Sequence, residues 1–154
     1  MTYSESDITN LLINYHAERE SISKTIVNLQ KQAADLFYPE SFRDIRVQNE
    51  FSQGQLIDSM LRRCDESREY QRRTLRDIKD MSDTLDRLMF HVNRLPGKLK
   101  LLVLDVMIGG ESIKSYAIKI DRSVETVSRM KSKAIDLVCS NMNKTRIGVS
   151  HAES

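Results

Sequence analysis

The sequence predicts an all-α protein, and three observations support this fold class. Only five Gly and two Pro occur in 154 residues, so turns are few. Aromatic residues make up 6% of the chain and Trp is absent, so any core should be aliphatic. Apolar residues also recur at helical spacing through two long stretches. Long helices should therefore account for most of the chain.

The first stretch predicts a helix over residues 7–37. Apolar side chains recur there at steps of seven, from Ile8 to Leu36. Pro39 ends the pattern because proline cannot continue a helix. An irregular connector is expected over residues 39–53.

A second heptad row begins at Ile57 and reaches Val92, which predicts a helix over residues 55–94. At 1.5 Å per residue this helix would be roughly 60 Å long. Neither helix can bury its apolar stripe alone, so the two either close on each other or pair across a dimer. We expect residues 1–94 to form an antiparallel coiled-coil-like hairpin that also mediates a homodimer.

Six arginines lie on one stretch of the second helix, between residues 62 and 76. They suggest either a nucleic-acid surface or a solvated face paired within the helix. The second interpretation is favoured because carboxylates stand four residues away from several of them. The expected ion pairs are Asp58–Arg62, Glu69–Arg73 and Arg76–Asp80.

The net charge of +2 hides an uneven distribution along the chain. Residues 1–94 carry 14 Lys and Arg against 16 Asp and Glu, whereas residues 95–146 carry 10 against 5. A local basic excess of this kind favours an anionic partner such as nucleic acid.

The sequence offers no signature of a membrane protein, a metal site or an enzyme. No apolar run approaches the roughly 18 residues of a membrane span, and the first residues do not resemble a leader. Cys64 and Cys139 lack the spacing of a metal site. His16, His91 and His151 are isolated, and no Gly-rich phosphate loop occurs. We expect a cytoplasmic, non-enzymatic protein with no catalytic residue, no metal and no cofactor.

Residues 95–140 are expected to form a domain of three short helices. Leu95-Pro96-Gly97 ends the long helix, and the apolar run that follows stops at Gly109-Gly110. Ser112 is placed to cap the second helix, and Ser123 to cap the third. The polar segment 141–154 is expected to be a disordered tail.

The break between the last two helices has the spacing of a helix-turn-helix. Counting from Ile113, the fifth position is the small residue Ala117, where two helices of this motif cross closely. The ninth position favours a positive φ and is Asp121, which tolerates that conformation better than most residues. Val127 and Met130 continue the apolar spacing. The alternative is an ordinary three-helix core with a hydrated surface.

DNA recognition requires short polar side chains and Arg near the start of the last helix, with basic residues at its flanks. Both kinds of residue are present, so double-stranded DNA is the expected partner. The candidate base contacts are Ser123, Glu125, Thr126, Ser128, Arg129 and Ser132. The basic residues around them are Lys98, Lys100, Lys114, Arg122, Lys131 and Lys133.

The last third of the chain resembles the fourth region of sigma-70-family factors, the domain that reads promoter DNA. The resemblance is carried by residues 110–117, 120–127 and 134–137. It implies that two basic residues lie near phosphates and that four residues face the major groove. The two residues near phosphates are Arg122 and Lys133. The four that face the major groove are Glu125, Thr126, Ser128 and Arg129.

Residues 1–94 lack the aromatic-rich helix with which a sigma factor melts DNA. The whole architecture is similar to phage regulators of late genes, such as the ArpU and RinA families. The favoured function is therefore a sequence-specific transcriptional regulator that acts at promoters through RNA polymerase. The alternative is a DNA-packaging adaptor similar to phage small terminase subunits, although those usually place their DNA-binding helices before the oligomerising ones.

Overall fold

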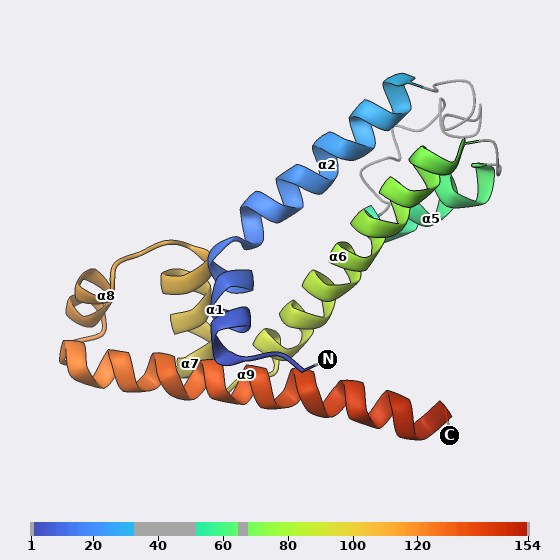
Figure 1. Ribbon diagram of the computed structural model, residues 1–154. Helices are drawn as coiled ribbons and strands as arrows, with labels where there is room; N and C mark the ends of the chain where they lie inside the picture. The colour runs from blue at the N-terminus through green and yellow to red at the C-terminus, as the bar shows by residue number, and fades with distance from the viewer. Residues whose placement is uncertain (1, 33–51, 65–67, 154) are drawn as a thin grey trace. The chain divides into compact units, whose positions relative to one another are not determined.

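The computed structural model describes residues 2–32, 52–64 and 68–153, with side chains as far as Lys144. Within these residues it contains seven α-helices and one π-helix and no strand, which confirms the all-α prediction (Figure 1). Two compact units are present: unit 1 comprises residues 1–16 and 85–154, and unit 2 comprises residues 17–84. The helices are α1 (Glu5–Ile13), α2 (Tyr15–Gln32), α5 (Gln53–Arg63), α6 (Glu69–Asn93), α7 (Gly97–Leu102), the π-helix η3 (Val103–Ile108), α8 (Ile113–Lys119) and α9 (Val124–Glu153).

The single helix expected over residues 7–37 is broken at Asn14. This residue lies at φ −96° and ψ 9°, outside the helical region, and separates α1 from α2. Its side-chain amide donates a 2.9 Å hydrogen bond to the carbonyl of Asn10, in the last turn of α1. Such local bonding competes with continuation of the helix. Residues 33–37 and most of the expected connector lie outside the described residues.

The prediction of a single helix over residues 55–94 is also wrong, because α5 ends at Cys64 and folds back along α6. The carboxylate of Asp58 lies 3.0 Å from the ammonium of Lys79. Twenty-one residues of unbroken helix would hold those two positions about 30 Å apart. The guanidinium of Arg72 donates a 2.7 Å hydrogen bond to the carbonyl of Cys64, and thus satisfies an acceptor that the end of α5 leaves open.

The fold-back also changes the ion pairs expected on this stretch. Glu69 and Arg73 form the predicted pair, at 3.8 Å. Asp58 pairs with Lys79 of α6 instead of Arg62 of its own helix, because Lys79 is brought close when α5 turns back. The third expected pair, Arg76–Asp80, does not form within 4.0 Å in the described part of the chain.

Unit 2 is built from three helices, where a two-helix hairpin was expected. α2 and α6 run antiparallel, and α5 packs with them (Figure 1). The side chain of Gln53, at the start of α5, donates to the carbonyl of Arg19 at 2.9 Å and to the hydroxyl of Ser23 at 2.6 Å, both on α2. The buried apolar residues are Ile22, Ile26, Leu29, Ile57, Met60, Cys64 and Leu75.

Unit 1 has one core to which all of its helices contribute. The three-helix domain expected over residues 95–140 is therefore not separate, because α1 and residues 85–94 complete its interior. A physical reason is size, because so short a segment buries little apolar surface and has at best marginal stability alone. The side chains that enter this core include Ile8 and Leu12 of α1, Leu88 and Val92 of α6, Leu102, Val103, Tyr116, Ala117, Val127 and Val138.

The start of the segment expected to be a disordered tail is packed into this core, since α9 continues to Glu153. Met142 is fully buried. The side-chain amide of Asn143 accepts from the backbone N–H of Tyr3 at 2.8 Å and donates to the carbonyl of the same residue at 3.0 Å. The thiol of Cys139 donates to that carbonyl as well, at 3.2 Å. The prediction is thus wrong for residues 141–143, because Met142 continues the buried row four residues after Val138.

The contribution of α1 to unit 1 can be tested by Ile8→Ala. Ile8 is fully buried, so we expect the free energy of unfolding to fall by about 2–5 kcal/mol through lost burial and the cavity left behind. Ile13 of the same helix is 56% exposed, and Ile13→Ala is the matched control. Chemical denaturation followed by circular dichroism measures both. Equal effects of the two substitutions would contradict the role of α1 in the core.

His91 of α6 is buried and should make stability depend on pH. Burial, aided by the nearby charges of Arg87 and Arg94, lowers the pKa of His91 below its ordinary 6.5. Below that pH the unfolded chain binds more protons than the folded one, so stability is lost as the pH falls. We expect His91→Gln to reduce the fall in unfolding free energy between about pH 7.5 and pH 5. An identical pH dependence in the unaltered protein and in His91→Gln would contradict this explanation.

Candidate nucleic-acid interface

The turn between α8 and α9 has the backbone conformation that the sequence predicts. The N–H of Arg122 donates to the carbonyl of Ala117 at 2.9 Å, and that of Asp121 to the carbonyl of Ile118 at 3.2 Å. This pair of bonds is the Schellman arrangement that ends many helices. Asp121 lies at φ 57°, which confirms the positive φ predicted for this position. The chain therefore leaves α8 and enters α9 within four residues.

The two helices are held together by small and apolar side chains. Ala117 and Tyr116 of α8 are buried, and Val127 of α9 is fully buried. A small residue at position 117 lets the helices approach closely, as expected from the sequence. Ser112 caps α8, because its hydroxyl accepts from the N–H of Ser115 at 3.0 Å.

A network on the other side of α8 fixes the helix against η3. The ammonium of Lys119 lies 3.3 Å from the carboxylate of Asp105 and 3.8 Å from that of Glu111. The same ammonium lies 5.8 Å from the ring centroid of Tyr116. Burial, with the charge of Asp105 adding to it, raises the pKa of Tyr116, so its phenol stays neutral. This network was not found from the sequence, because the π-helical turn that places Asp105 leaves no signal in the apolar spacing.

The end of η3 requires the glycine that follows it. The N–H of Gly109 donates to the carbonyl of Leu104 at 2.8 Å. A Cβ atom at Gly109 would lie 2.6 Å from the carbonyl oxygen of Asp105, closer than real side chains come. Gly110 then takes a φ of 78°, which favours glycine. The Gly-Gly pair therefore ends the helix as predicted, and its sterics also define where Asp105 lies.

Two of the predicted base contacts form the start of α9. The hydroxyl of Ser123 accepts from the N–H of Thr126 at 3.1 Å, which is an N-cap bond. The two hydroxyls are also hydrogen bonded to each other at 2.8 Å. Ser123 and Thr126 therefore have a structural role that already occupies much of their hydrogen-bonding capacity.

The other predicted residues lie on the outer side of the first three turns of α9 or beside them. Ser128 and Ser132 follow each other four residues apart, as do Glu125 and Arg129, so the two pairs form neighbouring rows. Glu125 also suits the positive end of the helix dipole. Of the ten predicted residues, Thr126, Ser128 and Lys131 are half-buried, and Ser123, Glu125, Arg129, Ser132, Lys133, Arg122 and Lys114 are exposed.

In the part of the chain that the structure describes, some cations are paired with carboxylates, and the predicted cations are not among them. Lys79, Lys119 and Arg73 have carboxylate partners. Within the described residues, no carboxylate lies within 4.0 Å of any predicted cation. The predicted cations are Lys98, Lys100, Lys114, Arg122, Arg129, Lys131 and Lys133. Their charge is therefore available to an anion outside the chain.

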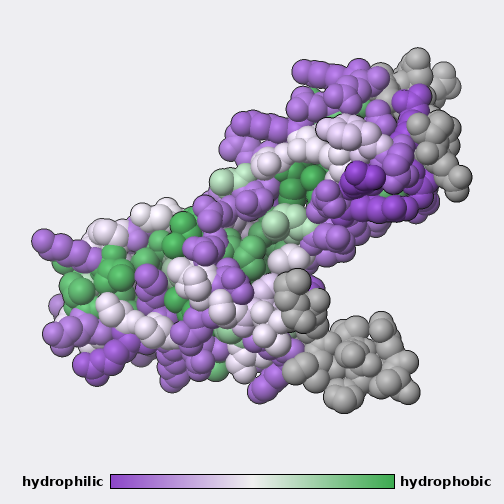
Figure 2. Space-filling view, in the orientation of Figure 1, coloured by the Kyte–Doolittle hydropathy of each residue, from purple (hydrophilic) through white to green (hydrophobic). Residues whose placement is uncertain are grey.

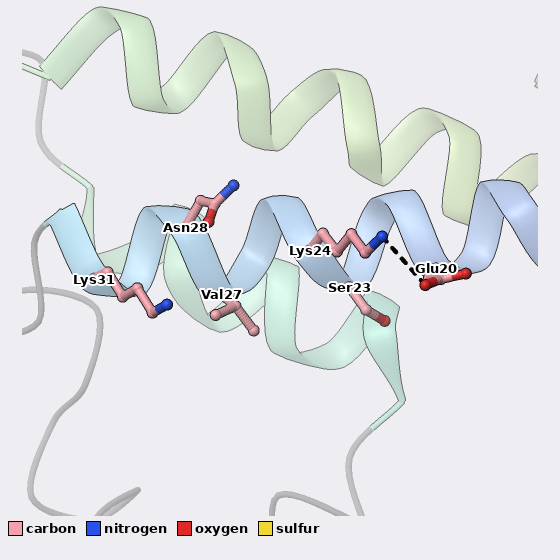
Figure 3. Close-up of a pocket in the computed structure, with 6 residues that line it drawn as sticks. All are labelled: Glu20, Ser23, Lys24, Val27, Asn28 and Lys31. Carbon is pink, nitrogen blue, oxygen red and sulfur yellow. Dashed lines mark ion pairs between the residues drawn. The ribbon is translucent and has the colours of Figure 1, made fainter.

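Other surfaces offer less chemistry. Figure 3 shows a shallow hollow whose described lining comes entirely from α2. Its charged groups include Glu20 and Lys24, which pair with each other at 3.2 Å. Among the described residues, no cluster of three His, Cys, Asp or Glu side chains could hold a metal ion. The same part of the chain has no helix long and apolar enough to span a membrane.

No family model, no curated protein sequence and no solved structure matches this chain. The turn between α8 and α9 and the charges around it are therefore the features from which a function can be inferred.

The backbone at Asp121 provides a test of the turn. A residue with a Cβ pays a conformational cost at positive φ that glycine does not pay. We expect Asp121→Gly to raise the free energy of unfolding by about 0.5–1 kcal/mol and Asp121→Val to lower it by at least about 1 kcal/mol. Urea denaturation measures both.

Asp136 is the matched control, because it is an exposed aspartate in the interior of α9. Glycine is the poorer helix former, so Asp136→Gly should not stabilise the protein. Stabilisation at both sites, or at neither, would contradict the proposed cost at Asp121.

Proposed function

We propose that this protein is a sequence-specific transcriptional regulator that binds double-stranded DNA at promoters, with α8 and α9 acting as a helix-turn-helix. The observation that carries the proposal is the α8–α9 turn, where Asp121 at positive φ and the buried Ala117 fix two helices in close contact. The start of the second helix presents polar and basic side chains to solvent. In proteins that use this motif, the start of the second helix enters the major groove.

The exposed side chains suit the edges of bases. Arg129 can donate two parallel hydrogen bonds to the O6 and N7 atoms of guanine. Glu125 can accept from the N4 amino group of cytosine, and Ser128 can donate or accept. The unpaired cations Lys114 and Arg122 lie on α8 and in the turn, where they can contact the phosphates that flank such a site.

The resemblance to the fourth region of sigma factors supports promoters as targets and RNA polymerase as a second partner. A homodimer through the long helices would present two recognition helices to two half-sites. Their centres would be about 34 Å apart, one turn of DNA. Mass measurement in solution tests this stoichiometry and would distinguish a dimer from the ring expected of a packaging adaptor.

The proposal predicts a base preference that depends on Arg129. Selection of fragments from a random DNA library by the full chain should enrich one motif. Loss of a bidentate contact costs about 1–3 kcal/mol, so Arg129→Ala should weaken binding to that motif by about 5- to 150-fold and relax one position. Fluorescence anisotropy with the selected duplex and a scrambled duplex measures the change.

Lys114→Ala is the matched control, because a lost phosphate contact should weaken binding to both duplexes alike and reduce its salt dependence. Arg73→Ala removes a cation that is already paired with Glu69 and should leave both duplexes unaffected. Failure to enrich any motif, or unchanged discrimination in Arg129→Ala, would contradict the proposed function.

A further inference from the structure

Val124 is an apolar side chain that the fold leaves in water at the start of α9. It is the first residue of the helix and is 48% exposed. Val127, one turn later, is fully buried in the core of unit 1. Val127 belongs to the core cluster of unit 1, and Val124 does not. Within the described part of unit 1, the core therefore ends before it reaches Val124.

Position 124 belongs to the surface that the proposed function assigns to DNA. Val124, Ser128 and Ser132 are spaced four residues apart, so they form one row along the helix. The row beside it holds Glu125 and Arg129. Figure 2 shows apolar surface at the end of unit 1 that carries α8, beside the hydrophilic surface of α9. An apolar group is thus set at the edge of a polar and basic surface.

The major groove presents one apolar group on the edges of the bases, the C5-methyl of thymine. The other edge groups are hydrogen-bond donors and acceptors, which a valine cannot satisfy. The two methyls of Val124 are also held in a narrow range of orientations, since a β-branched side chain in a helix has one strongly preferred rotamer. Contact between Val124 and the C5-methyl of a thymine would therefore cost little side-chain entropy.

We propose that Val124 selects a thymine in the target site by contact with its C5-methyl group. The inference rests on the proposed function and extends it, because Val124 supplies an apolar component to a readout otherwise made of hydrogen bonds. The selected thymine should neighbour the base pairs that Glu125 and Ser128 contact.

The experiment removes the methyl group of thymine and the methyl groups of Val124 separately. Each thymine of the selected duplex is replaced in turn by deoxyuridine, which lacks only the C5-methyl and keeps the base pairing. With the unaltered full-length chain, one replacement should weaken binding about fourfold, the value of one buried methyl-sized contact. With Val124→Ala, the same replacement should change the dissociation constant by less than about 1.5-fold.

Ile118→Ala is the matched control, because Ile118 is 76% exposed on α8 and outside the recognition rows. It should keep the full fourfold effect of the replacement. Thermal unfolding of each variant verifies that it is folded, and Val124→Thr, nearly equal in size, repeats the test with a minimal change in shape.

Three outcomes overturn the inference. The first is that no replacement weakens binding of the unaltered chain. The second is that the same replacement weakens binding of Val124→Ala and of Val124→Thr as much as binding of the unaltered chain. The third is that the selected site contains no thymine beside the bases read by Glu125 and Ser128. A separate result sinks the proposed function itself: equal affinity of the unaltered chain for selected and scrambled duplexes. The two failures are thus distinguished by one set of titrations.

Discussion

The α8–α9 turn depends on a core that its own helices cannot provide. α7, η3 and α8 are each seven residues or fewer, and helices this short have little stability of their own in water. Burial of Ile8 and Leu12 from α1 and of Leu88 and Val92 from α6 gives them an interior to pack against. The order of the exposed surface of α9 therefore depends on core contacts that α1 and α6 provide.

Among the described residues of unit 1, one cation, Lys119, is paired within the fold and those of the candidate site are not. Lys119 neutralises Asp105 and Glu111 and thereby joins α8 to η3. The cations around the start of α9 have no such partner among the described residues. Among the described side chains of residues 95–144, pairing with carboxylates thus occupies one cation, Lys119, and leaves the others available to an external anion. Net charge alone would have counted all of them equally.

Local signals in the sequence predicted the turn well, whereas long-range packing was missed. The caps at Ser112 and Ser123 and the positive φ at Asp121 depend on neighbouring residues, so the sequence is enough to predict them. The breaks at Asn14 and Cys64 were missed because the heptad spacing continues through both. In the candidate site, the sequence predicted Ser123 as a cap but not its hydrogen bonds with Thr126. It also gave no indication that Val124 would be exposed.

The clamp between Asn143 and Tyr3 joins residues 140 positions apart in the chain. α1 therefore emerges from the ribosome long before α9, and its apolar face is not fully covered until α9 has been made. Closing so long a loop is entropically costly and slows folding. In the sequence, unit 2 falls between the two segments of unit 1. All of its helices are therefore synthesised before α9. Synthesis order thus favours completion of unit 2 before unit 1, and the surface proposed to bind DNA would be completed last.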